Sequence, residues 1–257
     1  MAPTRAELRA VAANTVLLFQ NSLTHDPAVI ASVNQTTRIV DLPRGFPQPG
    51  PPTTPVEVWN LDTFDAAARL APAKACVLNM ASERTPGGGW LWGASAQEES
   101  LCRRSTLALT LAPDRFGAPQ LSVPHSYPLD WTEAIYSPDV RVFRDSDLAL
   151  LPAPFTVDVI SMPAQRNPPL RAEESYINDS VMRRKIDMVL TVPYRRGFTG
   201  PLVLGAFGCG CFKNPPIAVA KMFREALDRY GGFYSKIVFA IIGPEENRNA
   251  FVNKFTK

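Results

Sequence analysis

The most informative stretch of this chain covers residues 85–99 and reads TPGGGWLWGASAQEE. Its three consecutive glycines, Gly87–Gly89, permit backbone conformations that a Cβ atom disfavours, and they let N–H groups approach a ligand closely. After seven further residues come the amide of Gln97 and the adjacent carboxylates of Glu98 and Glu99. Because neighbouring carboxylates repel, the pKa of one can rise towards neutrality and suit that group for proton transfer. This layout is expected for cleaving a phosphate-bearing substrate.

Each part of this stretch also has a plainer interpretation. Acidic residues are common in the first turn of a helix, where they complement the macrodipole, and Glu98 and Glu99 fit that pattern. Glycine loops often only turn the chain, and Trp90 and Trp92 fit either surface anchors or a lid. The spacing matches neither GxGxxG nor GxxxxGK[ST]. The catalytic interpretation gains weight because the loop follows a buried strand that ends near Asn79.

Strands alternate with helices from Val56 onwards, which predicts an α/β domain with a mixed, mostly parallel sheet and helices on both faces. The predicted strands are 56–59, 75–78, 134–136 and 140–143 (these two as a hairpin), 155–160, 202–205 and 237–242. The predicted helices are 62–70, 98–111, 173–192, 217–230 and 244–255.

The N-terminal part has a different character. Thr4 and Glu7 have capping-box spacing, and apolar residues follow at helical intervals. Residues 41–55 contain six prolines and are typical of a wrapping or connecting segment. We therefore expect residues 1–55 to form a helical and wrapping extension and residues 56–257 to form the main catalytic domain.

A second glycine loop covers residues 205–216 and reads GAFGCGCFKNPP. It leads from a strand to a helix, so its successive N–H groups would form an anion-binding nest, with Phe212 packing a sugar or a base. The alternative is a tight turn with Phe212 in the core. Cys209 and Cys211 are interpreted as small residues beside the nest rather than as reactive thiols. Ligands bind at the carboxyl ends of strands in such sheets, so this loop and the strand ends at 78–82 and 160–164 would share one cleft if the strands are adjacent.

The composition limits the class of function. The chain has 257 residues, of which 46% are hydrophobic and 20% charged, with a net charge of +3. This charge permits an anionic ligand but is far from that of a dedicated duplex binder. Lys213, Arg195 and Arg196 are candidates for added positive charge near a diphosphate, against the ordinary alternative of solvated surface residues.

The cysteines and histidines bear on compartment and metal binding. Four cysteines suggest no disulfide framework and favour a reduced, intracellular setting, in the cytoplasm or nucleus. The two histidines, His25 and His125, are not grouped with them as zinc ligands would be, so we expect no metal. No signal peptide and no membrane span is expected, because the longest early apolar run, Thr15 to Phe19, is far too short.

At this point a family resemblance becomes clear. Gly87–Gly89, seven residues and then Gln97–Glu99 resemble the GGG-x(6–8)-QEE signature of poly(ADP-ribose) glycohydrolases, and the surrounding residues look like the microbial type. Three further segments resemble that family: VLNMAS (77–82), GAFGCGCFKNPP (205–216) and VFAI (238–241). The likeness extends from about Val56 to Phe255.

The resemblance implies a macrodomain, a three-layer α/β/α sandwich that binds ADP-ribose. It implies that Glu99 is the catalytic acid and that Glu98 positions the ribose. The residues that it implies for substrate binding, with no cofactor and no metal, are Asn79, Ser82, Gly87, Gly88, Gly89, Gln97, Gly205, Ala206, Phe207, Gly208, Cys209, Gly210, Cys211 and Phe212. Among these, residues 208–211 would wrap the diphosphate through their N–H groups, and Phe212 would orient the terminal ribose.

The implied reaction is cleavage of the ribose–ribose bond through an oxocarbenium-like transition state. Glu99 would protonate the departing oxygen and then activate a water, while the diphosphate stabilises the positive ring. We expect poly(ADP-ribose) or ADP-ribosylated proteins as partners, no membrane contact, and a monomer. Hydrolysis of mono-ADP-ribosyl groups and non-catalytic binding of ADP-ribose are the alternatives.

Overall fold

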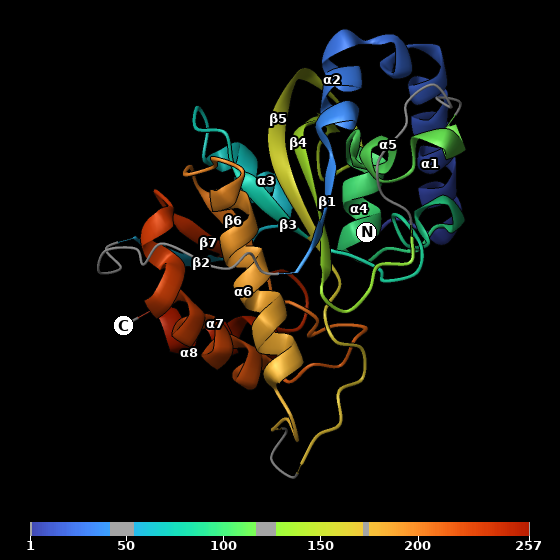
Figure 1. The fold of residues 1–257 in the computed structure, drawn as a ribbon. Helices are drawn as coiled ribbons and strands as arrows, with labels where there is room; N and C mark the ends of the chain where they lie inside the picture. Colours follow the sequence, from blue (N-terminus) through green and yellow to red (C-terminus); the bar gives the residue numbers. More distant parts are fainter. Residues whose placement is uncertain (1, 42–53, 117–126, 172–174, 257) are drawn as a thin grey trace.

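A mixed β-sheet organises the molecule, which is a computed structural model describing residues 2–41, 54–116, 127–171 and 175–256 (Figure 1). Within these residues seven strands form one sheet in the order β1-β4-β5-β3-β6-β7-β2. The strands are β1 (Thr37–Val40), β2 (Val56–Trp59), β3 (Cys76–Met80), β4 (Glu133–Arg144), β5 (Leu150–Met162), β6 (Leu202–Leu204) and β7 (Ile237–Ala240).

The strand directions confirm the predicted mostly parallel sheet. β5, β3, β6, β7 and β2 run parallel to one another, whereas β4 is antiparallel to both β5 and β1. β3 lies between β5 and β6, so the three strand ends that carry unusual residues are adjacent. The carboxyl ends of the parallel strands therefore meet at one edge of the sheet, as the cleft hypothesis requires.

Helices cover both faces of the sheet (Figure 1). The longer helices are α1 (Arg5–Asn21), α2 (Pro27–Gln35), α3 (Thr63–Arg69), α4 (Gln97–Arg104), α5 (Leu107–Leu111), α6 (Ser180–Arg195), α7 (Pro216–Tyr230) and α8 (Glu245–Phe255). The short helices are η1 (Leu23–His25), η2 (Trp90–Trp92), η3 (Pro113–Phe116) and η5 (Gly231–Phe233). None of the helices in the described ranges is long and apolar enough to cross a bilayer.

Two hydrophobic cores lie on opposite faces of the sheet. Side chains of α6, α7 and α8 pack with alternate residues of the central strands, such as Leu78 and Leu204. Side chains of α1 to α5 pack with the intervening residues, such as Val77 and Val203. Because successive side chains of a strand point to opposite faces, this division follows directly from the strand sequences. The predicted three-layer α/β/α architecture is confirmed.

The N-terminal segment is more closely joined to the main domain than the sequence suggested. The predicted capping box is present, since Thr4 and Glu7 cap α1 reciprocally. However, α2 and β1 were not predicted, and β1 adds an edge strand by pairing with β4. Phe19 of α1 is fully buried in the second core. Residues 42–53, which contain most of the proline-rich segment, lie outside the described residues, so the division at residue 55 stays a prediction.

Three other predicted elements differ in the structure. The predicted hairpin of 134–143 is wrong, because both pieces belong to β4, which is irregular between Ser137 and Val140. The predicted helix of 98–111 is broken after Arg104. There Ser105 forms an antiparallel β-bridge with Val142 of β4, and the Thr106 N–H donates to the Arg141 carbonyl at 2.9 Å. The helix predicted from residue 173 begins at residue 180, and residues 172–174 lie outside the described part.

Candidate active site

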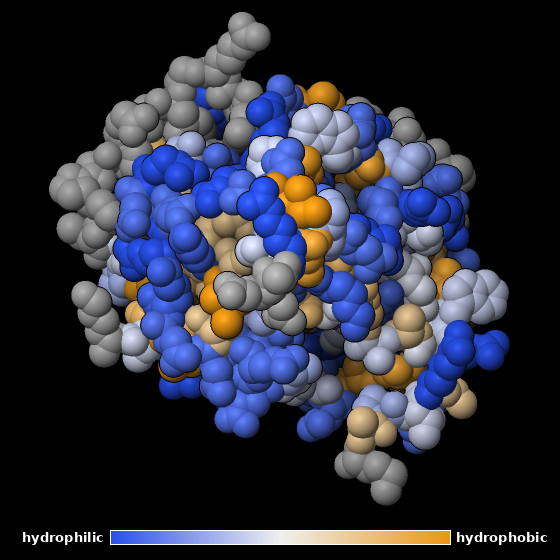
Figure 2. All heavy atoms as spheres, turned by 90° about the horizontal axis from the view of Figure 1, so that it is seen from below, coloured by the Kyte–Doolittle hydropathy of each residue, from blue (hydrophilic) through white to orange (hydrophobic). Residues whose placement is uncertain are grey.

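Both glycine loops lie at the edge where the parallel strands end. The first follows β3 and leads into α4, and the second follows β6 and leads into α7. Their strands are in direct contact, since a Cβ added at Gly205 would come within 3.2 Å of the Met80 methyl carbon. Figure 2 views the molecule from below, the side on which β5 ends, and shows apolar atoms near the middle of a mostly hydrophilic face.

Glu98 is enclosed beneath the first glycine loop. Its side chain is 4% exposed, and its Oε2 accepts the Ser82 N–H at 2.7 Å. Oε1 accepts the Gly87 N–H at 3.2 Å and is 3.4 Å from Asn79 Nδ2. Glu98 thus joins the end of β3 to the glycine loop, and in this arrangement both of its oxygens already have partners within the protein.

Burial has a strong electrostatic effect on this carboxyl. Removal from water raises the pKa of Glu98 to about 8, the N–H groups of Ser82 and Gly87 act in the opposite direction, and the negative charge of Glu99 adds to the rise. Near neutral pH Glu98 therefore retains its proton. The residue with the raised pKa is Glu98, whereas the sequence analysis assigned the proton donor to Glu99.

Glu99 is half-buried and faces the glycine loop. Its Oε1 accepts the Gly89 N–H at 3.0 Å, and within the described ranges no other donor contacts this carboxylate. Gly88 lies directly over the pair, with a φ of +59°, and a Cβ there would come within 2.4 Å of Glu99 Oε1 and 3.2 Å of Glu98 Oε2. Glycine is required here both by backbone conformation and by space. The loop therefore holds Glu99 by one oxygen, and its second oxygen has no hydrogen-bond donor in the described ranges.

The Gln97 side chain, besides being part of the motif, makes three hydrogen bonds that hold the structure together. Its amide donates to the Leu78 carbonyl at 2.7 Å and to Thr63 Oγ1 at 3.0 Å, and it accepts the Met80 N–H at 2.9 Å. These bonds fasten the first turn of α4 to the end of β3. All three polar contacts of Gln97 are to the protein, so its predicted part in substrate binding stays a prediction.

Asn79 is fixed from the neighbouring strand. Its Nδ2 donates to Ser161 Oγ of β5 at 3.0 Å, and both residues are fully buried. The Asn79 Oδ1 atom is buried without a donor among the described residues. Ser161 of β5 thus orients the Asn79 side chain.

A buried arginine supports the first loop from below. Arg103 is 1% exposed, and its guanidinium donates to the carbonyls of Trp90 at 3.0 Å and Ala94 at 2.5 Å. Trp90 packs against Phe19 of α1, whereas the Trp92 side chain is 66% exposed. The two tryptophans thus have different roles, and only the first belongs to the core.

The second glycine loop presents unpaired backbone donors. The N–H groups of Phe207 and Cys209 bond to the carbonyls of Gly205 and Ala206 at 2.8 and 3.0 Å. By contrast, four N–H groups have no acceptor among the described residues, namely those of Gly208, Gly210, Cys211 and Phe212. Successive free N–H groups in a tight turn form a nest that binds anions. The unpaired N–H groups lie where the sequence predicts an anion site, and their binding of an anion stays a prediction.

Asn214 maintains the shape of this nest. Its Nδ2 donates to the carbonyls of Gln165 at 2.7 Å and Gly208 at 3.1 Å, while its Oδ1 accepts the Tyr176 hydroxyl at 2.6 Å. Gly208 has a φ of +76°, and a Cβ there would come within 2.5 Å of Asn214 Nδ2. The nest thus depends on one buried amide and on one glycine that no other residue can replace without strain.

The side chains of the second loop differ in their surroundings. Phe207 is fully buried, so it contributes packing, whereas Phe212 is half-buried beside the nest and does not belong to the core interior. Burial raises the pKa of the Cys209 thiol to about 12, which fits the prediction that it is not a reactive thiol. Cys211 is exposed, and all four cysteines of the chain are free.

Some predicted contributors lie elsewhere. Arg195 is the last residue of α6, and Arg196 follows it. Arg196 lines a cavity of about 370 Å³ together with Lys74, which precedes β3, and Asp158 of β5. This cavity lies at the amino end of β3. The proposal that these arginines lie near the diphosphate is therefore wrong. Lys213 follows the nest directly, and His125 is outside the described residues.

No group of three His, Cys, Asp or Glu side chains suited to a metal ion occurs in the described ranges.

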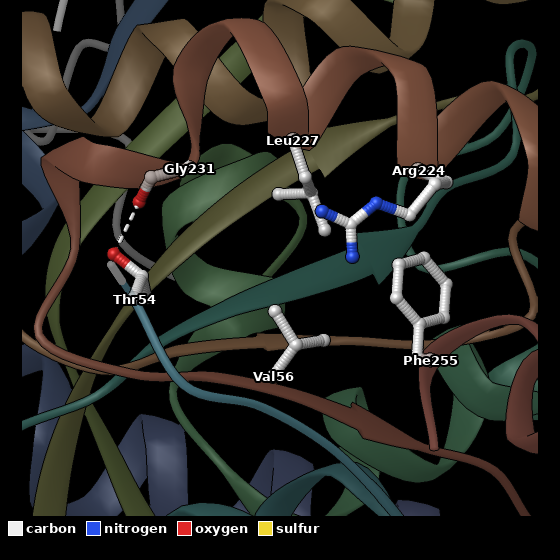
Figure 3. Close-up of a pocket in the computed structure, with 6 residues that line it drawn as sticks. All are labelled: Thr54, Val56, Arg224, Leu227, Gly231 and Phe255. Atoms are coloured by element: carbon white, nitrogen blue, oxygen red, sulfur yellow. Dashed lines mark hydrogen bonds between the residues drawn. The ribbon is translucent and has the colours of Figure 1, made fainter. Parts of the chain in front are cut away.

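A further cavity of about 220 Å³ lies between β2, α7 and α8. Figure 3 shows the guanidinium of Arg224 projecting between Leu227 and Phe255, with Thr54 bonded to the Gly231 carbonyl. No predicted site residue lines this cavity, and it is separate from the two loops.

Several residues that shape the site were missed by sequence reasoning: Thr63, Glu83, Arg103, Ser161, Arg166 and Asn214. Several of their partners are distant in sequence, by 83 positions between Arg166 and Glu83 and by 49 between Asn214 and Gln165. A weak signal existed for Asn214, because an asparagine just before two prolines is typical of a turn.

Comparison with known proteins agrees with this geometry. A family model described as the microbial-type PARG catalytic domain matches residues 5–145. No curated protein matches the chain significantly.

Solved structures extend the match beyond that range. The poly(ADP-ribose) glycohydrolase (PARG) from Thermomonospora curvata is similar, with a TM-score of 0.77, 32% identity, and coverage of 97% of this chain and 100% of that chain. A structure of the same enzyme bound to the inhibitor ADP-HPD has a TM-score of 0.73 at the same identity and coverage. The Deinococcus radiodurans PARG in complex with ADP-ribose has a TM-score of 0.70 and 32% identity, covering 90% of this chain and 98% of that one.

The family match covers more than half of the chain and includes the first glycine loop and both glutamates. The structural matches include the second loop as well, because they span nearly the whole chain. The chain therefore belongs to the microbial-type poly(ADP-ribose) glycohydrolase family.

Proposed function

We propose that this chain cleaves the ribose–ribose glycosidic bonds of poly(ADP-ribose) and releases ADP-ribose. The observation that carries the proposal is the arrangement of Glu99 and the anion nest on adjacent strands. Among the described residues, Glu99 has one oxygen held by Gly89 and the other without a donor, while the nest offers N–H groups without acceptors, which suit a diphosphate. A ligand that joins a diphosphate to a ribose would bring its glycosidic bond to this carboxylate.

The proposed mechanism assigns the two carboxyls different tasks. Glu99 would protonate the departing ribose oxygen as the bond breaks and would then take a proton from the attacking water. The bound diphosphate would stabilise the positive ring. Glu98, enclosed and bonded to Ser82 and Gly87, would position the ribose and hold the loop in place. Its raised pKa keeps Glu98 itself protonated near neutral pH.

The test compares wild type with Glu99→Gln on purified poly(ADP-ribose), with release of free ADP-ribose as the readout. We expect turnover to fall by about 10²- to 10⁴-fold, because a general acid–base residue contributes about this much. Calorimetry should show that ADP-ribose affinity is retained. Glu225→Gln, in the middle of α7, is the matched control and should leave turnover unchanged. Full activity in Glu99→Gln would refute the assignment.

The same experiment separates the alternatives. Release of ADP-ribose from singly modified protein, but not from polymer, would indicate a mono-ADP-ribosyl hydrolase. Tight binding of ADP-ribose without turnover of any linkage would indicate a non-catalytic reader. We further propose that the protein acts as a monomer inside the cell, which sedimentation and fractionation would test.

A further inference from the structure

A short segment after β5 connects the two glycine loops. The Asn167 N–H donates to the Phe212 carbonyl at 2.8 Å, and the Gln165 carbonyl accepts from Asn214 at 2.7 Å. Residues 165–167 are thus bonded to the second loop on both sides of Arg166. The backbone of this segment fixes where the Arg166 side chain begins.

The Arg166 side chain extends from this segment to make two contacts at once. Its Nε and Nη2 donate to the two oxygens of Glu83 at 2.9 and 3.2 Å, which fixes the plane of the guanidinium. The same guanidinium lies over the Phe212 ring, 3.9 Å from the ring centroid. Arginine suits both tasks because its planar fork matches a carboxylate while its face stacks on an aromatic ring.

Glu83 belongs to the other side of the site. It follows Ser82, whose N–H holds Glu98, and its carbonyl accepts the Leu129 N–H at 2.8 Å. Partial burial acts to raise the pKa of Glu83, but the hydrogen bonds and charge of Arg166 outweigh this and lower it. Glu83 is therefore charged near neutral pH and can hold the guanidinium. A continuous set of contacts joins the carboxyl pair to the ring of Phe212.

We infer that Arg166 is a positioning residue, held by Glu83, which fixes the Phe212 ring for the ribose that is cleaved. This inference rests on the proposed function and adds a residue that is absent from the motif of either loop. Arg166 acts through Phe212, so it governs the geometry of the reacting sugar more than the affinity for the diphosphate, which the backbone nest binds.

Burial distinguishes this role from a purely structural one. The side chains of Arg166 and Glu83 are 46% and 25% exposed. A partly exposed ion pair contributes little to folding stability. Loss of Arg166 should therefore change stability little, while a misplaced ring should change turnover considerably, because small displacements of reacting groups are costly.

The experiment measures kcat, KM and ADP-ribose affinity for Arg166→Lys, Phe212→Leu and the double variant. We expect Arg166→Lys to lower kcat about 10-fold and to change KM and the Kd for ADP-ribose less than about 3-fold. The double variant should be no slower than Phe212→Leu alone, since coupled residues are not additive. Arg224→Lys is the matched control, because Arg224 pairs with Asp228 and lies over the Phe255 ring far from the site.

Two results would overturn the inference. One is an additive loss in the double variant, which would mean that Arg166 acts independently of the ring. The other is an unchanged Phe212 ring position in a crystal structure of Arg166→Lys with ADP-ribose. The crystallographic readout needs no turnover, so it tests the positioning role even if wild type fails to cleave the polymer and the proposed function is itself refuted.

Discussion

The two glycine loops occupy equivalent places on neighbouring strands, yet they are built in opposite ways. The first loop, residues 85–99, brings charged side chains together and needs a buried network to hold them: Gln97 fastens the helix, Glu98 fastens the loop, and Arg103 supports it from below. The second loop, residues 205–214, offers bare N–H groups and depends on Asn214. In the proposed function, the first loop provides proton chemistry and the second provides anion binding.

This difference predicts that equivalent glycine substitutions have different consequences. Gly88→Ala should have the largest effect, because its Cβ would come within 2.4 Å of Glu99 Oε1 at a φ of +59°. Displacing the carboxylate by about 1 Å should lower turnover about 100-fold or more. ADP-ribose affinity should change much less, as measured by calorimetry.

Gly197→Ala is a suitable control for this variant. Its φ of +83° imposes similar backbone strain, but no atom lies within 4 Å of the new Cβ. If both variants lose turnover equally, backbone strain rather than contact with Glu99 is responsible, and the contrast between the loops is weakened.

Gly208→Ala should show the opposite pattern. Its Cβ would come within 2.5 Å of Asn214 Nδ2 and 2.6 Å of the Ala164 Cβ, which would distort the nest. We expect ADP-ribose to bind about 10- to 100-fold more weakly, since losing one charge-assisted hydrogen bond costs about 1.5–3 kcal/mol. Gly210→Ala, where the Cβ meets nothing within 4 Å, should bind normally; weaker binding there as well would contradict this account.

The raised pKa of Glu98 predicts that the folding stability of the protein depends on pH through a residue of the first loop. Because the folded-state pKa of about 8 exceeds the ordinary value of 4.5, the folded state binds more protons than the unfolded state between these values. Stability should therefore fall as pH rises from about 4.5 to 8, by up to about 1.4 kcal/mol per pH unit.

Chemical denaturation at several pH values would measure this slope. In Glu98→Gln, which cannot ionise, the decline should be shallower over the same range. An identical slope in wild type and variant would mean that Glu98 is not the group responsible.

The smallest effect is expected at Cys209. Cys209 is partly buried, desolvation raises the pKa of its thiol to about 12, and its N–H is already bonded to the Ala206 carbonyl. Cys209→Ala should change ADP-ribose affinity less than about 3-fold, and iodoacetamide at pH 7.5 should leave Cys209 unmodified in the folded protein. Rapid alkylation with loss of binding would show that side-chain chemistry also matters in the second loop.

Much of this molecule could be predicted from local pattern. Alternating strands and helices indicated the layered α/β fold, and the spacing of Thr4 and Glu7 identified the start of α1. The first glycine loop and the acids after it were recognisable because glycine conformation and carboxylate chemistry are properties of the residues themselves. Local pattern failed at Ser105, where pairing with β4 interrupts a helix that the sequence alone would continue.

The precise roles within the site were decided by contacts between distant segments. Which of the adjacent glutamates is enclosed depends on how α4 docks on β3, and desolvation then separates the environments of Glu98 and Glu99. Arg166 meets Glu83 and Phe212 only because β5, β3 and β6 end side by side. Residue chemistry and short-range spacing thus specify the kind of site, whereas burial and long-range pairing, which arise only on folding, assign each residue its task.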